Sequence, residues 1–371
     1  MTTQTQPDPT ELPEGVAPAG AVSMEELALA ARNHGMPLEA LRYDLTPVGL
    51  HYLLIHFDIP HLDEATWGLS VRGRVRRSLE LTLEQVRSRP AVTVPVTMEC
   101  AGNGRARLDP RPVSQPWLHE AVGTAEWTGT PLAPILDEAG VLDDAVEVVF
   151  TGHDRGVQGD VEQDYERSLT VDEARRGDVL LAYAVNGQPL PPQHGYPLRL
   201  VVPGWYGMTH VKWLRAVTVV AEPFVGYQQV DSYRLRQSQE EPGDPVTLIR
   251  VRALMVPPGI PDFLSRHRVL PAGECLLRGR AWSGAAPVTR VEVSVDGGRT
   301  WGDADLGTPL GRHAWASWSH PWTATPGEHV LCCRASDADG NTQPVDQPWT
   351  VEGMANNMVQ RVPVRVDPAA G

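Results

Sequence analysis

Apolar residues near the N-terminus recur three and four positions apart, as they do on one face of a helix. A serine followed three residues later by a glutamate forms a capping box in front of them. The pattern predicts a helix over residues 24–33 that ends before Gly35, and a second short helical piece over 38–42. The residues that carry the pattern are Ser23, Met24, Glu26, Leu27, Ala28 and Ala31. Residues 1–20 are rich in Pro, Thr and Glu, which predicts disorder.

Apolar runs of strand length alternate with short amphipathic stretches in the next two hundred residues. The runs predict strands over 53–57, 70–75, 146–150, 179–185, 198–202 and 211–220. Short helices are predicted after Thr82, after Thr130-Pro131 and after Thr170, because threonine is a good N-cap residue. The last two are expected to end at Gly140 and Gly177. Asn186-Gly187 predicts a tight hairpin turn.

The pattern changes after an acidic, proline-bearing stretch at 240–245, which is typical of a linker. Short alternating strands follow over 247–254, 275–282, 288–295, 313–319, 329–335 and 347–352, and glycine-containing turns separate them. Strands at this spacing predict an immunoglobulin-like β-sandwich. Cys332 and Cys333 lie in one strand and should point to opposite faces, so no disulfide is expected between them.

The fold class expected from these patterns is α+β. A mixed α/β domain over 46–239 follows an N-terminal arm over 1–45, and the β-sandwich occupies 240–371. The length of 371 residues agrees with two domains.

Charge and cysteine usage exclude several classes of protein. A formal net charge of −14 argues against nucleic acid or an anionic membrane as the main partner, although a basic pocket could still bind an anionic substrate. No apolar run approaches the ~20 residues of a membrane helix. The four cysteines form no C-x-x-C motif, which excludes zinc-finger, dithiol-redox and c-type haem sites. The first fourteen residues show no export signal, so a cytoplasmic location is expected.

Four segments bring glycines and reactive side chains together where a strand enters a loop: 94–105, 152–156, 194–199 and 203–213. In the first, Cys100 precedes Gly102, Gly104 and Arg105. A thiolate suits a soft metal, and glycine lets the backbone approach a bulky ligand. Arginine and lysine suit a phosphate or an oxyanion. Taken singly, each residue has a plainer interpretation, and Cys100 would more often be a small buried hydrophobe.

The joint order of the motifs is more specific than any one of them. The stretches 99–105, 178–191, 194–204 and 210–214 together resemble the sulfite oxidase family of molybdenum enzymes. The stretches 281–284 and 293–301 resemble the immunoglobulin-like dimerisation domain of that family. The resemblance covers roughly residues 40–365, and it implies a molybdopterin-binding oxidoreductase domain over 46–239 and a homodimer.

The resemblance also implies catalytic roles for particular residues. Cys100 matches the cysteine whose thiolate binds molybdenum, and Tyr183 matches the tyrosine beside the reactive oxygen. Arg105 matches a substrate-site arginine, and His56 matches the histidine that closes an Arg-Asn-His motif of the family.

A second group of residues is expected to hold the cofactor, molybdenum bound to molybdopterin. Asp154, His194, Arg199 and Lys212 match positions that hold the pterin and its phosphate. His210 is expected beside them, as is His56. The implied reaction is a two-electron oxygen-atom transfer on a small anionic or oxo substrate. No haem segment is present, so electrons are expected to pass to a separate acceptor such as a small redox protein or a quinone.

Two departures from the family pattern leave the substrate open. Leu54 stands where the family has an arginine, and Glu352 stands where its sulfite oxidases place another. A carboxylate at that place would weaken the binding of an oxyanion. Reduction of an oxyanion or of an S- or N-oxide at the same site therefore remains an alternative, as does a cofactor-binding protein with no sulfite activity.

Overall fold

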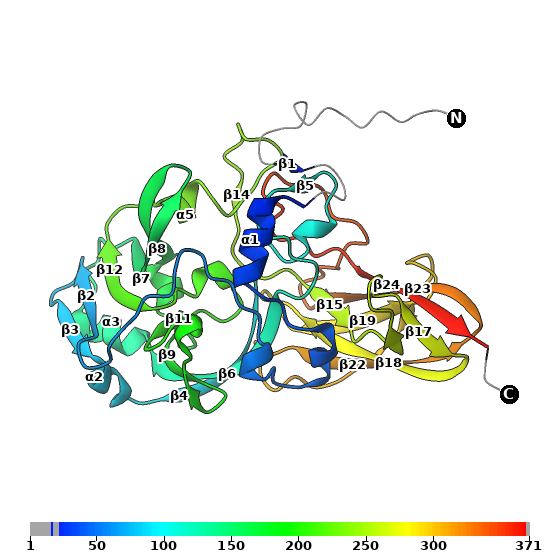
Figure 1. Cartoon of the computed structure of the whole chain (residues 1–371). Helices are drawn as coiled ribbons and strands as arrows, with labels where there is room; N and C mark the ends of the chain where they lie inside the picture. Colours follow the sequence, from blue (N-terminus) through cyan, green and yellow to red (C-terminus); the bar gives the residue numbers. More distant parts are fainter. Residues whose placement is uncertain (1–15, 18–21, 369–371) are drawn as a thin grey trace.

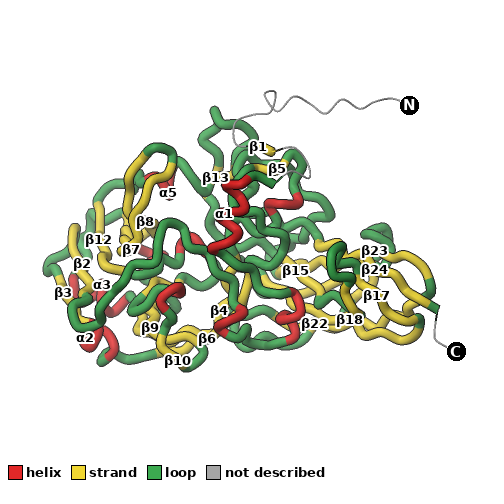
Figure 2. The backbone as a smooth tube through the Cα atoms, viewed as in Figure 1, coloured by secondary structure: helices red, strands yellow, loops and turns green. Residues whose placement is uncertain are grey.

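The computed structural model describes residues 16–17 and 22–368, which form two parts that lie side by side (Figure 1). The first part packs two sheets and several short helices together, and the second is a β-sandwich. Strands and irregular loops dominate both parts (Figure 2). The disorder predicted for residues 1–20 concerns residues outside the described ones, apart from the short strand β1 (Val16–Ala17), which pairs with β5 (Arg111–Pro112).

The first part contains two five-stranded sheets. In one, the order is β10-β9-β6-β4 with β11 also paired to β9, and every pairing is antiparallel. In the other, the order is β3-β2-β12-β7-β8, and only β2 and β12 are parallel. The strands of the first sheet are β4 (Val92–Glu99), β6 (Val122–Pro131), β9 (Leu180–Val185), β10 (Gln188–Pro189) and β11 (Arg199–Val201). Those of the second are β2 (Gly68–Gly73), β3 (Leu79–Thr82), β7 (Glu147–Gln158), β8 (Val161–Thr170) and β12 (Leu214–Val220).

The helices are short and start at the expected caps in most cases. The α-helices are α1 (Met24–Arg32), α2 (Leu83–Arg87), α3 (Ala133–Ala139), α4 (Val171–Ala174) and α5 (Tyr227–Val230). The 3-10 helices are η2 (Leu38–Arg42), η3 (Val48–Leu50), η4 (Arg105–Arg107), η5 (Pro192–His194) and η6 (Gly207–Thr209). Capping boxes at Ser23 and Thr82 open α1 and α2, which confirms both predictions.

Two predicted helix boundaries are wrong. Helix α3 does not start after Thr130, because Thr130 and Pro131 still belong to strand β6, although its end at a left-handed Gly140 is confirmed. Helix α4 begins after Thr170 but ends at Ala174, before Gly177.

The predicted strand over 53–57 is also wrong. Leu53 makes one isolated bridge to His34, and the rest of this stretch is irregular. The other strands predicted for the first part are confirmed, with shifted ends. The Asn186-Gly187 turn joins β9 to β10 with both residues at positive φ, as a tight hairpin requires.

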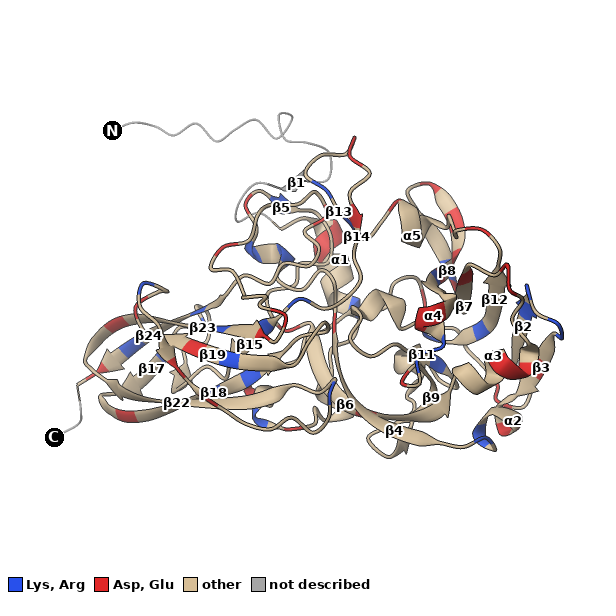
Figure 3. Ribbon diagram, turned by 180° about the vertical axis from the view of Figure 1, so that it is seen from behind, with Lys and Arg blue, Asp and Glu red and all other residues tan. Residues whose placement is uncertain are grey.

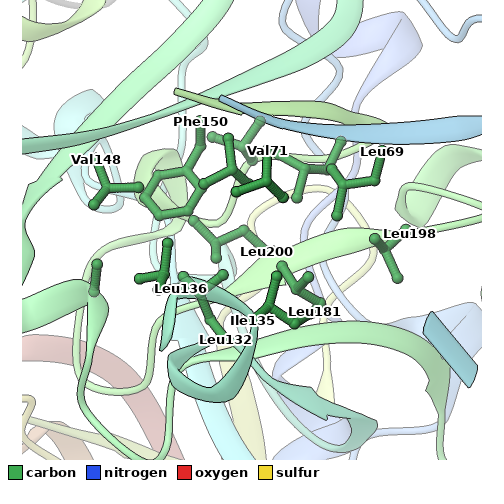
Figure 4. Packing of buried hydrophobic residues seen from close by; sticks show 14 of the residues in the cluster. Leu69, Val71, Leu132, Ile135, Leu136, Val148, Phe150, Leu181, Leu198 and Leu200 are labelled. Carbon is green, nitrogen blue, oxygen red and sulfur yellow. The ribbon is translucent and has the colours of Figure 1, made fainter. Parts of the chain in front are cut away.

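A large apolar core fills the space between the two sheets. Leu69, Val71 and Phe150 of one sheet meet Leu181 and Leu200 of the other, and α3 contributes further buried side chains (Figure 4). Successive side chains of a strand point to opposite faces of its sheet, so each sheet has a second face turned away from this core. That second face of the β9 sheet packs in a separate cluster around Cys100.

The second part consists of two sheets with a common core. One has the order β15-β18-β22-β21 and the other β16-β17-β24-β23-β19-β20. The strands are β15 (Arg252–Met255), β16 (Ile260–Pro261), β17 (Arg268–Pro271), β18 (Gly273–Trp282), β19 (Val288–Ser294), β20 (Gly302–Asp303), β21 (Asp305–Leu306), β22 (Ala316–Ala324), β23 (Gly327–Asp337) and β24 (Gln360–Asp367). A pair of short strands, β13 (Arg234–Leu235) and β14 (Asp244–Pro245), leads into this part.

The sandwich predicted from the sequence is confirmed, with one strand misplaced. Residues 347–350 are irregular and 351–352 lie in a turn, and the last strand is β24 instead. Cys332 and Cys333 are free thiols in β23, and only Cys333 belongs to the sandwich core.

The two parts share a buried contact. Met36, Tyr206, Trp282 and Trp315 belong to one apolar cluster that draws on both. Beside it, Glu99 at the end of β4 is ion-paired with Arg252 of β15, and both side chains are at most 2% exposed. On the outside, acidic and basic residues are interspersed over both parts (Figure 3).

Candidate functional site

Cys100 lies where two cavities meet. It directly follows strand β4, and its N–H donates to the carbonyl of Ala121. We call the cavity lined by Asp154, His194, Arg199, His210 and Lys212 the inner cavity. We call the one lined by Arg105, Gln158, Arg236 and Glu352 the outer cavity. Leu54, His56, Cys100 and Tyr233 line both.

The inner cavity collects every residue that the sequence assigned to cofactor binding. Different elements supply them: Asp154 comes from β7, His194 from η5 and Arg199 from β11, whereas His210 and Lys212 precede β12. Gly195, at φ +102°, lets these elements come close, because a Cβ there would lie 3.1 Å from Cβ atoms of both Arg199 and Lys212. The seven residues brought together are His56, Cys100, Asp154, His194, Arg199, His210 and Lys212.

The inner cavity is cationic. Burial lowers the pKa of Arg199 to about 10, which leaves it charged at neutral pH. Its Nη1 and Nη2 donate to the carbonyls of His194 (3.0 Å) and His210 (3.1 Å). Lys212 Nζ donates to the carbonyl of Leu54 at 2.8 Å. Burial lowers the pKa of Lys212 and raises that of the Asp154 carboxyl, and the attraction between their opposite charges counteracts both shifts.

The histidines of the inner cavity are neutral near pH 7. Burial lowers the pKa of His56 to about 4 and that of His210 to about 3. His210 Nδ1 accepts from the N–H of Val202 at 3.1 Å, so its other nitrogen, 3.0 Å from the carbonyl of Trp205, carries the proton. These rings therefore serve as hydrogen-bond groups and not as cations.

The loop after Cys100 is held from the sandwich side. Ala355 N–H donates to the carbonyl of Ala101 at 2.6 Å, and Asn356 Nδ2 donates to that of Gly104 at 2.8 Å. Arg105 Nε donates to the carbonyl of Glu352 at 2.7 Å. We call residues 352–356 the clasp. Because the clasp contacts both ends of the loop, the position of Cys100 depends on the second part of the molecule.

Arg105 lines the outer cavity in a fixed orientation. Besides Glu352, it donates through Nη1 to the carbonyl of Gln115 (3.2 Å) and through Nη2 to the sulfur of Met354 (3.4 Å). Gly102 makes room for it, since a Cβ there would lie 2.7 Å from the guanidinium. Burial lowers the pKa of Arg105, and a thiolate at Cys100 would oppose that shift and favour the cationic form.

His56 belongs to a network of glutamines at the same cavity. Its Nε2 lies 2.7 Å from Oε1 of Gln158 and 3.3 Å from Nε2 of Gln228. Gln228 is 1% exposed and also donates to Gln163. The network fixes the ring of His56 between the two cavities.

Tyr183 does not lie at this site, contrary to the expectation from the resemblance. In β9 it shares a face with Leu181, which packs into the large core, whereas Leu180 and Ala182 face the cluster that contains Cys100. Arg87 lies over its ring at 5.8 Å. The alternation of the strand therefore turns Tyr183 to the side of the sheet away from Cys100.

The tyrosine at the site is Tyr233, which the sequence reasoning missed. It is buried, lines both cavities and is hydrogen-bonded to Tyr165. Its φ of +57° is a strained value for a tyrosine. Glu352 holds it there, because Oε2 accepts from the Tyr233 N–H at 3.1 Å. A tyrosine between a short helix and a linker gives no periodic signal, so the sequence pattern could not single it out. His51, Tyr52 and Tyr165 of the inner cavity were missed for the same lack of a motif.

No cluster of side chains among the described residues could hold a metal ion by itself. Within residues 16–17 and 22–368, no three His, Cys, Asp or Glu side chains come close enough together to do so. A metal at Cys100 would thus need most of its ligands from a cofactor. Burial raises the pKa of the Cys100 thiol, and coordination to a metal would deprotonate it outright.

Comparison with known proteins agrees with this arrangement. Residues 56–228 match the model of the oxidoreductase molybdopterin-binding domain, and residues 247–367 match that of the Mo-co oxidoreductase dimerisation domain. The chain belongs to the sulfite oxidase family of molybdenum enzymes. Its first domain is an oxidoreductase molybdopterin-binding domain, and the cofactor is molybdenum bound to molybdopterin.

Relatives in this family differ in the activity that their names give. Mitochondrial sulfite oxidase of Mus musculus is 34% identical over 344 residues, which cover 87% of this chain and 62% of that protein. Nitrate reductase [NAD(P)H] of Hordeum vulgare is 33% identical over 351 residues, 87% of this chain and 39% of that protein. The chain thus spans less than two thirds of the length of either relative.

A solved structure shares the fold over nearly the whole chain. The sulfane dehydrogenase SoxCD of Paracoccus pantotrophus superposes with a TM-score of 0.78 at 24% identity, over 98% of both chains. No helix in the part of the chain that the structure describes is long and apolar enough to cross a membrane.

The inner cavity fits the family's anionic cofactor. Three buried polar atoms that line it make no hydrogen bond to the described residues: His51 Nε2, Asp154 Oδ1 and Arg199 Nε. Buried polar groups normally have partners, so these three atoms fit a polar ligand in the cavity. Arg199 and Lys212 would hold its phosphate, and Asp154 and the histidines its hydrogen-bonding edge.

We expect acid to destabilise the protein through the buried histidines. Burial lowers the pKa of His51 and His56 from 6.5 to about 4. As the pH falls below 6.5, the unfolded chain takes up these protons first, so the free energy of unfolding falls until about pH 4. Each histidine contributes roughly 3 kcal/mol over this window, at ~1.4 kcal/mol per pKa unit. Urea unfolding of the apoprotein at several pH values measures the loss.

The variant His56→Gln isolates one of these contributions. It should flatten the pH dependence by roughly 3 kcal/mol, while His267→Gln, at an exposed position, should leave it unchanged. A His56→Gln curve parallel to that of the wild type would contradict the assignment.

Proposed function

We propose that this enzyme catalyses a two-electron oxygen-atom transfer at a molybdenum centre ligated by Cys100. The observation that carries the proposal is the place of Cys100, whose side chain lies between a cationic inner cavity and an outer cavity open to a substrate. When bound, the cofactor supplies the redox chemistry. The substrate gains an oxygen atom derived from water, and two protons and two electrons are released.

The chain's own residues bind and orient the reactants. Arg105 presents a fixed positive charge to the substrate, since its backbone and sulfur contacts hold the guanidinium in place. Tyr233 offers a neutral hydroxyl, because burial raises its pKa to about 12. His56 and its glutamines order the wall between the cavities. We propose Tyr233 for the role that the sequence resemblance gave to Tyr183.

The electrons leave singly to a separate acceptor, for which a small redox protein or a quinone is our proposal. We further propose a homodimer in the cytoplasm. The match of residues 247–367 to a dimerisation domain supports the dimer.

Metal analysis and turnover together test the function. Protein made in a host that synthesises the cofactor should contain about one molybdenum atom per chain. Loaded enzyme should turn over sulfite, nitrate or a sulfoxide with an artificial dye as the electron carrier. Protein without molybdenum, or loaded enzyme inactive toward all three, would contradict the proposal.

The opposite direction of reaction is a second candidate. Nitrate reductases are among the relatives that match 87% of this chain. Reduction of an oxyanion or of an S- or N-oxide would use the same cavities, with a reduced dye as the electron source. The same screen separates the two directions.

A further inference from the structure

An ion pair forms part of the wall of the outer cavity. Glu352 Oε1 lies 2.8 Å from Nη2 of Arg236, and the two side chains are 19% and 14% exposed. The other carboxylate oxygen of Glu352 accepts from Ser232 Oγ and from the Tyr233 N–H, each at 3.1 Å. Four contacts, counting the backbone bond from Arg105, therefore fix Glu352 at the cavity.

The charges that line the outer cavity balance. Its described lining contains two arginines, Arg105 and Arg236, and two carboxylates, Asp231 and Glu352. His56 adds no charge near pH 7, because burial lowers its pKa to about 4. A dianion entering this cavity would meet no net attraction to offset the loss of its hydration.

The size and lining of the outer cavity also differ from what a small oxyanion needs. Its volume is ≈ 470 Å³, within the range of about 300–1,000 Å³ typical of small-molecule sites. About half of the wall is apolar, and this half includes Phe57, Val113, Val157, Tyr227 and Val351. Apolar walls stabilise the carbon frame of an organic ligand.

We propose that the Arg236–Glu352 pair is a specificity device that makes this cavity select a neutral or singly charged organic substrate over a small dianion. Glu352 cancels the charge of Arg236 and leaves Arg105 to orient one polar group of the substrate. The reaction of the bound substrate rests on the proposed function. The selection by charge is a property of binding to this chain and does not depend on that reaction.

Equilibrium binding to the holoenzyme tests the proposal without turnover. Sulfate serves as the divalent probe and dimethyl sulfoxide as the neutral one, each titrated by calorimetry. Glu352→Gln keeps an oxygen acceptor for the Tyr233 N–H and removes the charge. We expect sulfate to bind about tenfold more tightly to Glu352→Gln than to the wild type, and dimethyl sulfoxide to bind equally to both. Equal sulfate affinity in the two proteins would overturn the proposal.

A double variant separates charge from structure. Arg236→Gln combined with Glu352→Gln is again neutral, so its sulfate affinity should return to that of the wild type, whereas a purely structural effect would not reverse. Glu138→Gln is the matched control, because Glu138 is also paired with arginines but lies away from the cavity. It should leave sulfate binding unchanged.

Wild-type protein supplies an independent measurement if the variants do not fold. Weak sulfate binding that changes little with ionic strength supports a neutral cavity, and tight binding that falls steeply with salt contradicts it. Molybdenum content is determined on the same samples. Absence of the metal would count against the proposed function, while the anion affinities would still decide the charge selection.

Discussion

Replacing Cys100 with serine is expected to reduce turnover by more than about 100-fold. Loss of groups that only support a metal ligand already costs about 10–100-fold, and loss of the ligand itself should cost more. A hydroxyl is a harder and far less acidic donor than a thiol, so it suits this metal poorly. Initial rates with a dye acceptor measure the effect, and elemental analysis shows whether the variant still contains molybdenum.

Cys275→Ser is the matched control for this prediction. Cys275 is a free, half-buried thiol in β18 of the sandwich and lines neither cavity. Its variant should keep wild-type activity and metal content. Full activity of Cys100→Ser would show that the ligand assignment is wrong.

Replacing Arg252 with methionine is expected to lower the free energy of unfolding by about 3–5 kcal/mol, the usual cost of leaving one member of a buried ion pair alone. Glu99 would keep only its contacts to Asn103 Nδ2 (2.9 Å) and Trp282 Nε1 (2.8 Å). The clasp would also lose the hydrogen bond that Arg252 donates to the carbonyl of Asn356 at 2.7 Å. Urea unfolding of the apoprotein measures the loss.

Two further variants test whether the unpaired charge of Glu99 causes this loss of stability. Arg290→Met removes a half-exposed arginine of the sandwich that is paired with the exposed Asp303 and with Glu292. Glu292 keeps its ion pair with Arg334, so this variant should cost less than about 1 kcal/mol. The double variant Glu99→Gln with Arg252→Met leaves no unpaired charge and should recover part of the loss. If Arg252→Met is as stable as Arg290→Met, the Glu99–Arg252 ion pair does not stabilise the contact between the two parts of the molecule.

The sequence predicted the inner cavity better than the outer one. Cys100, His194, Arg199 and Lys212 lie in short motifs next to strand ends, and strand ends are easy to locate from apolar runs. Tyr183 was misassigned because it also lies in such a motif, while the face toward which a strand residue points depends on the sheet packed against it.

Only the resemblance pointed to residues of the outer cavity, namely Leu54, Arg105 and Glu352, because tertiary contacts create this cavity. Tyr233 has a positive φ, and its N–H donates to Glu352, which lies 119 residues further along the chain. Glu352 was recognised as a departure from the family pattern that would weaken oxyanion binding, but nothing in the sequence pairs it with Arg236. The predicted strand over 53–57 failed for a related reason, because this stretch follows the cavity walls and not a sheet edge.

The clasp changes how substrate preference could diversify in this family. The residues that hold the pterin lie in one domain, but the segment that tunes the outer cavity belongs to the other and connects two sandwich strands. A short exchange at 352–356 between homologous chains would therefore alter selectivity without replacing any of the residues that hold the pterin. Substrate preference could thus change in evolution through substitutions in a loop of the sandwich, with no change to the sequence motif around the cysteine.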